Sequence, residues 1–173
     1  MTAPVPGHAF PDFDLPRVGG GRIDNSIFAA SKVTILNSYR GLHCPRCERQ
    51  LQEIVARTSE FAEYGAQIVS FSTDVEDRAT QAATDWGLGD MAVGHSLTLP
   101  QARAFGLFVS ESIREGEPGF FAEPGVFIVT QDGKLWGSVV GTFPFIRPNA
   151  EQLLDALNAL VQRDYPARGT IAA

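Results

Sequence analysis

The two cysteines of this 173-residue chain, Cys44 and Cys47, lie at a junction between a strand pattern and a helix pattern. The apolar, β-branched run 33–36 precedes them, and a helical spacing of apolar residues follows them as far as Gly65. Pro45 suits the first helical position, because its missing N–H would have no partner there. We therefore expect Cys44 at the N-cap of a helix, Cys47 in its first turn, and the end of that helix at Gly65.

This junction has consequences for sulfur chemistry. Unpaired N–H groups and the positive end of the helix dipole face both sulfurs and favour the thiolate, which is the nucleophile in thiol exchange. Arg40 and Arg46 are close in sequence, and we expect their charges to lower the pKa of the attacking thiol further. A pair spaced this closely encloses too short a loop to stabilise the chain, so we expect Cys44 and Cys47 to be catalytic and to cycle between dithiol and disulfide.

Three other interpretations of the cysteine pair are weaker. Two ordinary buried cysteines would not need a helix start or neighbouring arginines. A zinc site needs three or four ligands, but only His8, His43 and His95 remain and none forms a second spaced pair. A hydrolase-type cysteine needs a histidine partner, and His43 is too near in sequence to point reliably at Cys44. We expect neither a metal nor a cofactor.

The remaining pattern predicts one α/β domain over residues 1–173. A strand at 67–72 is followed by a helix that Thr73 or Asp74 would cap, which continues a β-α-β-α alternation and implies parallel strands covered on both faces. The segment 91–97 is ambiguous. Asp132-Gly133 predicts a hairpin turn between two later strands, and Pro148 stands near the start of a final helix.

Charge and hydropathy exclude several classes of partner. The net charge of −6 argues against binding to a nucleic-acid backbone or an anionic membrane. No apolar run approaches the roughly 20 residues that span a bilayer, and the first residues have neither a charged leader nor an apolar signal core. We therefore expect a soluble, cytoplasmic protein.

Several segments between about Pro11 and Leu160 resemble the AhpC/TSA, or peroxiredoxin-like, family of the thioredoxin superfamily, in its C-x-x-C branch. They are residues 11–15, 39–47, 124–129 with Asp132-Gly133, and 142–148. The resemblance implies a thioredoxin-like fold with a central mixed sheet flanked by helices on both faces. It also implies a cofactor-free redox enzyme, and family analogy favours a homodimer.

The chain departs from the peroxiredoxin motif Pro-x-x-x-Thr-x-x-Cys at two positions. Alignment puts Arg40 at the proline, Cys44 at the threonine and Cys47 at the peroxidatic cysteine. Pro124 replaces the arginine that usually precedes the late strand and stands where thioredoxin-like proteins have a cis-proline. A cis Glu123–Pro124 bond would form a platform for the substrate backbone, so these two residues are the candidate substrate-binding residues.

The resemblance and the cysteine pair lead to three functional hypotheses. The first is a thiol-disulfide oxidoreductase in which Cys44 attacks a protein disulfide and Cys47 releases the product. The second is an antioxidant thiol peroxidase that reduces hydrogen peroxide or alkyl hydroperoxides, with Cys47 oxidised first and Cys44 condensing with it. The third is a non-enzymatic redox-sensing binding module. Either enzyme would need a thiol reductant, such as a thioredoxin-like protein or glutathione.

Overall fold

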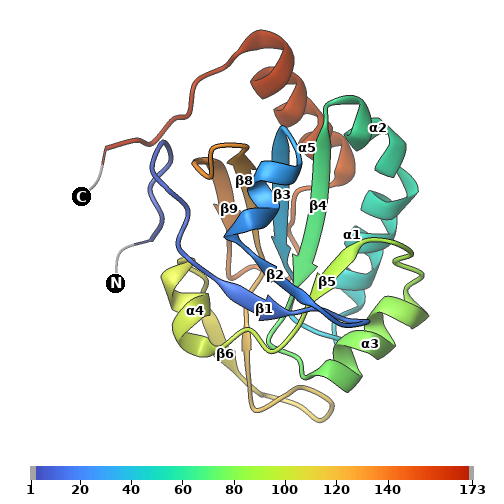
Figure 1. The fold of residues 1–173 in the computed structure, drawn as a ribbon. Helices are drawn as coiled ribbons and strands as arrows, with labels where there is room; N and C mark the ends of the chain where they lie inside the picture. Colours follow the sequence, from blue (N-terminus) through green and yellow to red (C-terminus); the bar gives the residue numbers. More distant parts are fainter. Residues whose placement is uncertain (1–2, 172–173) are drawn as a thin grey trace.

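The computed structural model describes residues 3–171, so the two outermost residues at each end of the domain predicted over 1–173 lie outside it. A five-stranded sheet in the order β5-β4-β3-β8-β9 forms its centre (Figure 1). The bounds are Val33–Ser38 for β3, Ala66–Phe71 for β4, Ala92–Gly94 for β5, Gly125–Thr130 for β8 and Leu135–Val140 for β9. β4 is parallel to β3 and β5, and β8 is antiparallel to β3 and β9, as predicted for a mixed sheet.

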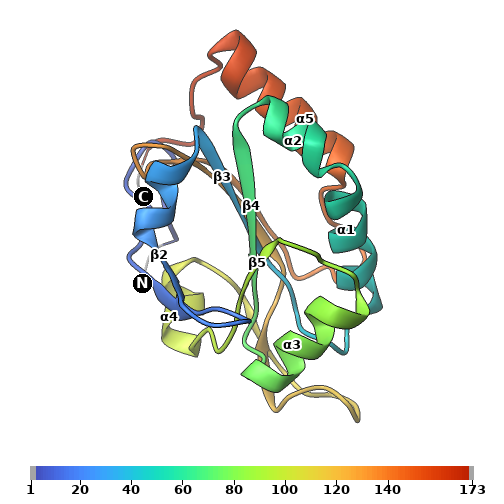
Figure 2. The ribbon, with the colours of Figure 1, turned by 45° about the vertical axis from the view of Figure 1, so that its right-hand side comes forward.

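Helices cover both faces of this sheet (Figure 2). One face carries α1 (Pro45–Ala56), α2 (Thr58–Glu63), α3 (Glu76–Asp85) and α5 (Ala150–Leu157), which continues into η2 (Asn158–Gln162). The other face carries η1 (Asn25–Ala30) and α4 (Leu99–Ala104). Side chains alternate along a strand, so Ile35 of β3 packs in the first core and Leu36 in the second. This two-sided burial explains the continuous apolar run that the sequence shows.

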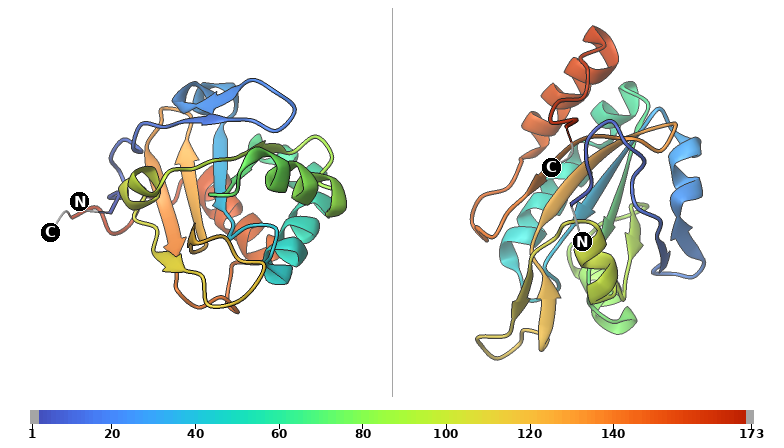
Figure 3. Two further views of the ribbon diagram at one scale, coloured as in Figure 1. Left: turned by 90° about the horizontal axis from the view of Figure 1, so that it is seen from below. Right: turned by 90° about the vertical axis from the view of Figure 1, so that its left-hand side faces the viewer.

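Two small hairpins extend the fold. β1 (Asp14–Pro16) pairs with β2 (Arg22–Asp24), and the three glycines before Arg22 all have positive φ, which suits the turn between the two strands. β6 (Val109–Glu111) pairs with β7 (Phe120–Ala122) and continues past the end of the central sheet (Figure 3). This second hairpin lies beside the cysteines and contributes side chains to their surroundings.

The predicted cysteine helix is two helices in the structure. α1 ends at Ala56 and α2 begins at Thr58, because Arg57 leaves helical geometry with φ −116° and ψ 20°. The Thr58 hydroxyl donates to the Val55 carbonyl at 2.8 Å and so offers that carbonyl an alternative to the next helical bond. The predicted stop is confirmed, since Gly65 adopts φ +66° directly before β4.

The predicted cap of the next helix is wrong. Val75 is the N-cap of α3, and no side chain caps it. The Asp74 carboxylate instead accepts the Leu42 N–H at 2.7 Å and pairs with Arg78 at 3.0 Å. Asp74 therefore ties the start of α3 to the loop before the cysteines.

The later elements agree better with their predictions. The ambiguous segment 91–97 contains the short edge strand β5, and the Asp132-Gly133 turn joins β8 to β9. The final helix starts just after Pro148, with Asn149 as its cap. Within residues 3–171, no helix combines the length and the apolar character that crossing a bilayer requires.

Candidate active site

Cys44 and Cys47 lie where the chain leaves the carboxyl end of β3 and enters α1 (Figure 1). Cys44 is the N-cap of α1, Pro45 follows it in the first turn, and the Cys44 sulfur accepts the Cys47 backbone N–H at 3.4 Å. Both cysteines are free thiols, with exposed fractions of 2 % for Cys44 and 0 % for Cys47. The predicted placement of the pair at a helix start is confirmed.

The Cys44 thiol is strongly acidified. A hydrogen bond from the Cys47 thiol makes the largest contribution, and the Cys47 backbone N–H and the charges of Arg147 and Arg40 add to it. Burial acts in the opposite direction and is outweighed, so the pKa of Cys44 falls from its ordinary value to about 5. Cys44 is therefore a thiolate at neutral pH.

Cys47 behaves in the opposite way. Burial and its hydrogen bond to Cys44 raise the pKa of the Cys47 thiol well above its usual range. The Arg40 backbone N–H donates to the Cys47 sulfur at 3.2 Å from inside the protein. At neutral pH the thiolate is therefore at Cys44, while Cys47 stays protonated.

Arg147 is a site residue that the sequence analysis did not single out. Its Nη2 donates to the Cys44 sulfur at 3.5 Å and to the Pro144 carbonyl at 3.2 Å. The segment 142–148 resembles a family segment, but nothing in it indicates contact with a cysteine that precedes Arg147 by 103 residues. Only the folded chain brings this cation to the sulfur.

Arg40 points its side chain away from the sulfurs and into a buried cluster. Its guanidinium pairs with Glu123 at 3.2 Å and with Glu117 at 3.7 Å, and it lies over the Phe121 ring at 4.6 Å. Its charge also lowers the pKa of Cys44, but by less than the charge of Arg147 does. The direct contact between Arg40 and the cysteine pair is the hydrogen bond from its backbone N–H to the Cys47 sulfur.

The other predicted site residues lie nearby in different roles. Arg46 is exposed on α1 and lies over the Phe145 ring at 5.7 Å, and its influence on the thiolate stays a prediction. Glu123 is engaged by Arg40, and residues 3–171 contain no cis peptide bond. The Glu123–Pro124 bond is therefore trans, so the platform that a cis bond would form is absent. A substrate-binding role for these two residues stays a prediction.

The loop before Cys44 is fixed by a buried carboxylate. Gly41 adopts φ +134°, and a Cβ at this position would lie 2.7 Å from Asp74 Oδ2. Asp74 also accepts the Leu42 N–H, and the Gly41 carbonyl accepts the Cys44 N–H at 3.0 Å. His43 follows on this loop and packs against Phe121 at 4.9 Å between ring centroids, where burial lowers the pKa of its imidazole.

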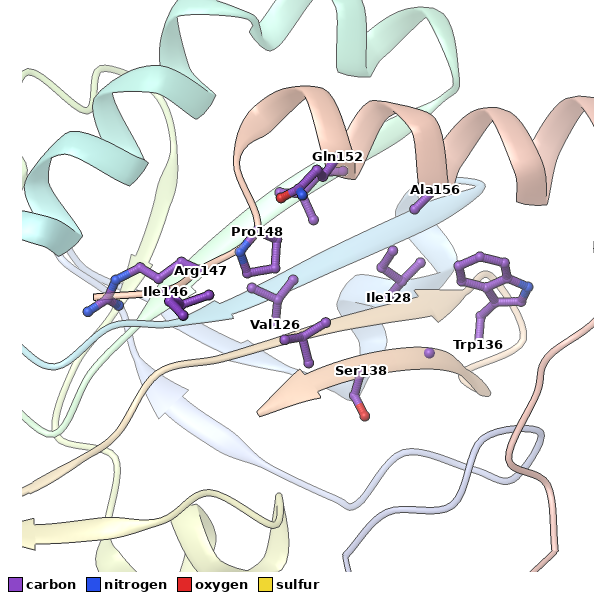
Figure 4. Close-up of a pocket in the computed structure, with 12 residues that line it drawn as sticks. Val126, Ile128, Trp136, Ser138, Ile146, Arg147, Pro148, Gln152 and Ala156 are labelled. Carbon is purple, nitrogen blue, oxygen red and sulfur yellow. The ribbon is translucent and has the colours of Figure 1, made fainter. Parts of the chain in front are cut away.

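An apolar cavity of about 550 Å³ opens between α5 and the strands β8 and β9. Arg147 and Ile146 lie at one end and Trp136 at the other, with Val126 and Ile128 along the sheet side (Figure 4). Arg147 lines this cavity at one end, and its guanidinium also contacts the Cys44 sulfur. Within residues 3–171, no group of three or more His, Cys, Asp or Glu side chains is placed to hold a metal ion.

A mixed sheet that presents an acidified thiol at a helix N-terminus, with a buried thiol behind it, defines a thioredoxin-like dithiol protein. The model of the AhpC/TSA family matches residues 6–137 of this sequence, which is more than half of the chain. The chain belongs to the AhpC/TSA family. A comparison with curated proteins found no significant match.

Peroxiredoxins are among the solved structures with the same fold. The peroxidoxin BcpB of Mycobacterium tuberculosis superposes with a TM-score of 0.75 at 22 % identity, covering 91 % of this chain and 98 % of that chain. AhpC of Enterococcus faecalis gives a TM-score of 0.76 at 19 % identity and covers 99 % of both chains. Reduced Prx3 of Vibrio vulnificus, solved in complex with hydrogen peroxide, gives 0.76 at 18 % identity and covers 91 % and 99 %. These likenesses establish the fold.

Family membership confirms that the chain is an oxidoreductase that works through thiol chemistry. It favours the enzyme over the non-enzymatic redox-sensing module. It also favours the thiol peroxidase, the second hypothesis from the sequence, over the thiol-disulfide oxidoreductase that the sequence analysis placed first.

Proposed function

We propose that this protein is a thiol peroxidase in which Cys44 attacks the peroxide and Cys47 resolves the product. The observation that carries the proposal is the acidified Cys44 sulfur, with a pKa of about 5, held between a helix N-terminus and the Arg147 guanidinium. This order of attack differs from the peroxiredoxin pattern, in which the position of Cys47 reacts first. It follows from the opposite pKa shifts of the two thiols.

The proposed reaction has two steps, oxidation of Cys44 by the peroxide and formation of a disulfide with Cys47. The Cys44 thiolate attacks the terminal peroxide oxygen, the O–O bond breaks, and the leaving alkoxide or hydroxide takes up a proton. Cys44 is then a sulfenic acid. The Cys47 sulfur attacks it, hydroxide leaves with the Cys47 proton as water, and a Cys44–Cys47 disulfide forms. Two electrons have passed from the dithiol to the peroxide, and an external thiol must return them.

Access to the sulfur favours a small oxidant. Cys44 is only 2 % exposed, so a peroxide reaches it more readily than a folded protein disulfide does. The Nε and Nη1 atoms of Arg147 are buried and have no hydrogen-bond partner among the described residues. A peroxide oxygen at Cys44 would supply an acceptor for such donors, and their charge would stabilise the leaving oxygen.

The apolar cavity beside Arg147 supports an organic hydroperoxide as substrate. Its walls are formed largely by side chains such as Val126, Ile128 and Trp136 (Figure 4), which can cover an alkyl or aryl group. A hydroperoxide whose polar end reaches Cys44 would extend its apolar part into this space. We expect a higher catalytic efficiency with cumene hydroperoxide than with hydrogen peroxide.

A thiol-disulfide oxidoreductase is the second candidate, and a surface feature favours it. Phe143, Phe145 and Ile146 precede Arg147, and their side chains have exposed fractions of 65, 67 and 72 %. Exposed apolar side chains next to a reactive thiolate provide a surface that a polypeptide substrate would cover. We also propose that the protein takes its electrons from a thiol reductant, forms a homodimer and is located in the cytoplasm.

Stopped-flow oxidation tests the proposed function. One equivalent of cumene hydroperoxide should oxidise the reduced protein rapidly and yield the Cys44–Cys47 disulfide, seen by mass spectrometry after alkylation. Cys47→Ser should accumulate a sulfenic acid at Cys44, and Cys44→Ser should lose the fast reaction. Slow oxidation by both peroxides together with rapid exchange with a protein disulfide would reject the peroxidase in favour of the oxidoreductase.

A further inference from the structure

Three arginine side chains gather beside Cys44. Arg46 and Arg49 lie three residues apart on α1, and Arg147 reaches the same place from the segment before α5. Together they line a recess of about 180 Å³, whose other walls are Gln50, Glu53, Phe145, Pro148 and Asn149. Because Arg147 also donates to the Cys44 sulfur, the recess adjoins the reactive atom.

The recess is electropositive in a chain whose net charge is −6. Among residues 3–171, neither Arg46, Arg49 nor Arg147 forms an ion pair, whereas Arg40 and Arg78 are both paired. Glu53 is the single carboxylate in the lining, and its Oε1 accepts the Ala150 N–H at the start of α5. The N-termini of α1 and α5 both lie at this recess and add partial positive charge. The recess therefore suits an anion.

The inference rests on the proposed thiol peroxidase function. The catalytic cycle of that enzyme indicates which anion would bind in the recess. Each turnover leaves a Cys44–Cys47 disulfide that an external thiol must reduce. Cys47 is fully buried, so the attack falls on Cys44, beside Arg147. Guanidinium groups bind carboxylates through paired hydrogen bonds. A thiol that carries a carboxylate would be held next to the sulfur it attacks.

We propose that the recess lined by Arg46, Arg49 and Arg147 binds the carboxylate of a low-molecular-weight thiol that reduces the Cys44–Cys47 disulfide. Its size and the low exposure of Cys44 favour a small molecule over a protein reductant. The thiolate of the reductant attacks the Cys44 sulfur, the disulfide breaks, and Cys47 leaves and takes up a proton. A second thiol then attacks the reductant's sulfur in the mixed disulfide and releases the Cys44 thiolate. Two small thiols become one disulfide, and the protein regains two electrons.

Glutathione and its diethyl ester provide the test, because the ester keeps the thiol and loses both carboxylate charges. The protein is first oxidised with diamide, so that the measurement does not depend on any peroxidase activity. Reduction is followed by quenching with an alkylating agent and mass spectrometry. We expect glutathione to react faster than the ester, and added salt to slow glutathione alone.

The variants report on the recess directly. Arg49→Gln should slow reduction by glutathione about threefold with the ester rate unchanged, and the addition of Arg46→Gln should slow the glutathione reaction about tenfold in all. Arg103→Gln is the matched control, since Arg103 is an exposed arginine on α4, and it should change neither rate. Equal wild-type rates for glutathione and the ester, or an equal effect of the variants on both, would overturn the inference. So would faster reduction by a thioredoxin that the arginine substitutions leave unaffected. Failure of the peroxidase proposal would appear elsewhere, as slow oxidation by peroxide.

Discussion

Cys44 and Cys47 share one helical turn, yet the pKa of the Cys44 thiol is lowered and that of the Cys47 thiol is raised. Cys44 accepts hydrogen bonds from the Cys47 thiol and N–H and lies 3.5 Å from a cationic nitrogen of Arg147. Cys47 is enclosed by the core, where a charged sulfur would lose its hydration. The same hydrogen bond between the thiols favours the anion at Cys44 and the neutral thiol at Cys47. The difference in acidity between the two sulfurs is therefore present before any substrate binds.

The pH dependence of alkylation tests this difference. Only the thiolate reacts, and the pKa of Cys44 is about 5, so its reactivity toward iodoacetamide should be constant above about pH 7 and half-maximal near pH 5. Cys47→Ala removes the strongest hydrogen bond to the anion and should move the midpoint upward. Peptide mapping of quenched samples gives the rate at each cysteine. A wild-type midpoint near 8.5, the value of an unperturbed thiol, would contradict this assignment.

Arg147 should contribute to both the pKa and the peroxide chemistry. Arg147→Gln removes the cation nearest to the Cys44 sulfur, so the thiol pKa should rise and the second-order rate with peroxide at pH 7 should fall by about tenfold or more. Stopped-flow oxidation and the alkylation profile measure the two effects separately. Arg103→Gln, an exposed substitution on α4, serves as the control. An unchanged peroxide rate in Arg147→Gln would exclude a catalytic role for this arginine.

At the scale of elements, the junction between β3 and α1 depends on contacts from elsewhere in the chain. Asp74, from the β4–α3 connection, binds the loop that precedes Cys44. The β6–β7 hairpin encloses Arg40 through Glu117 and Phe121. The turn that presents Cys44 is thus held by two segments far from it in sequence. Its geometry should respond to substitutions that disturb either segment.

Gly41→Ala tests the tightness of this loop. The backbone has φ +134°, and the added Cβ would lie 2.7 Å from Asp74 Oδ2, so the variant should lose about 2 kcal/mol or more of stability and react more slowly at Cys44. Gly19→Ala is the matched control, because Gly19 also has positive φ (+81°) but nothing lies within 4 Å of the added atom. It should lose about 1 kcal/mol and keep its reactivity. Urea denaturation and alkylation rates check both effects, and equal losses in the two variants would contradict the prediction.

At the scale of the whole molecule, the acidified thiol links folding to pH. The pKa of Cys44 is lower in the folded chain, about 5, than in the unfolded chain, roughly 8.5, so the unfolded state binds more protons between these values. The corresponding stabilisation is present above pH 8.5 and is lost as the pH falls toward 5. The raised pKa of Cys47 acts only as the pH rises toward roughly 8.5 and above, where it lowers stability, because at lower pH Cys47 is protonated in both states.

We therefore expect the unfolding free energy of the reduced wild type to fall more steeply from pH 8 to pH 5 than that of Cys44→Ser. The limiting slope for one proton is about 1.4 kcal/mol per pH unit. Urea denaturation at four pH values under reducing conditions measures the difference between the two proteins. Parallel pH profiles would show that Cys44 does not gain its acidity on folding.

Most of the architecture could be predicted from the sequence because its signals are local. The β-branched run at 33–36, Gly65 and the Asp132-Gly133 turn each specify their own element, and each prediction holds. The failures arise where a residue has a partner far away. The sequence predicts Thr73 or Asp74 as a helix cap, but the Asp74 carboxylate binds the Leu42 N–H and pairs with Arg78. The edge strand β5 has only three residues, too few for a periodic pattern.

The sequence by itself determined that a dithiol stands at a strand-to-helix junction. Pro45 and the apolar patterns on either side fix that position, and the helix dipole follows from it. The tertiary structure decided which sulfur is acidified and which cation contacts it. Arg40 is near the cysteines in sequence, but its guanidinium pairs with Glu117 and Glu123. Arg147 contacts the Cys44 sulfur although it lies 103 residues further along the chain. The pKa of a thiol depends on its burial and on the charges near it in space, and both are determined by how the folded chain packs around it.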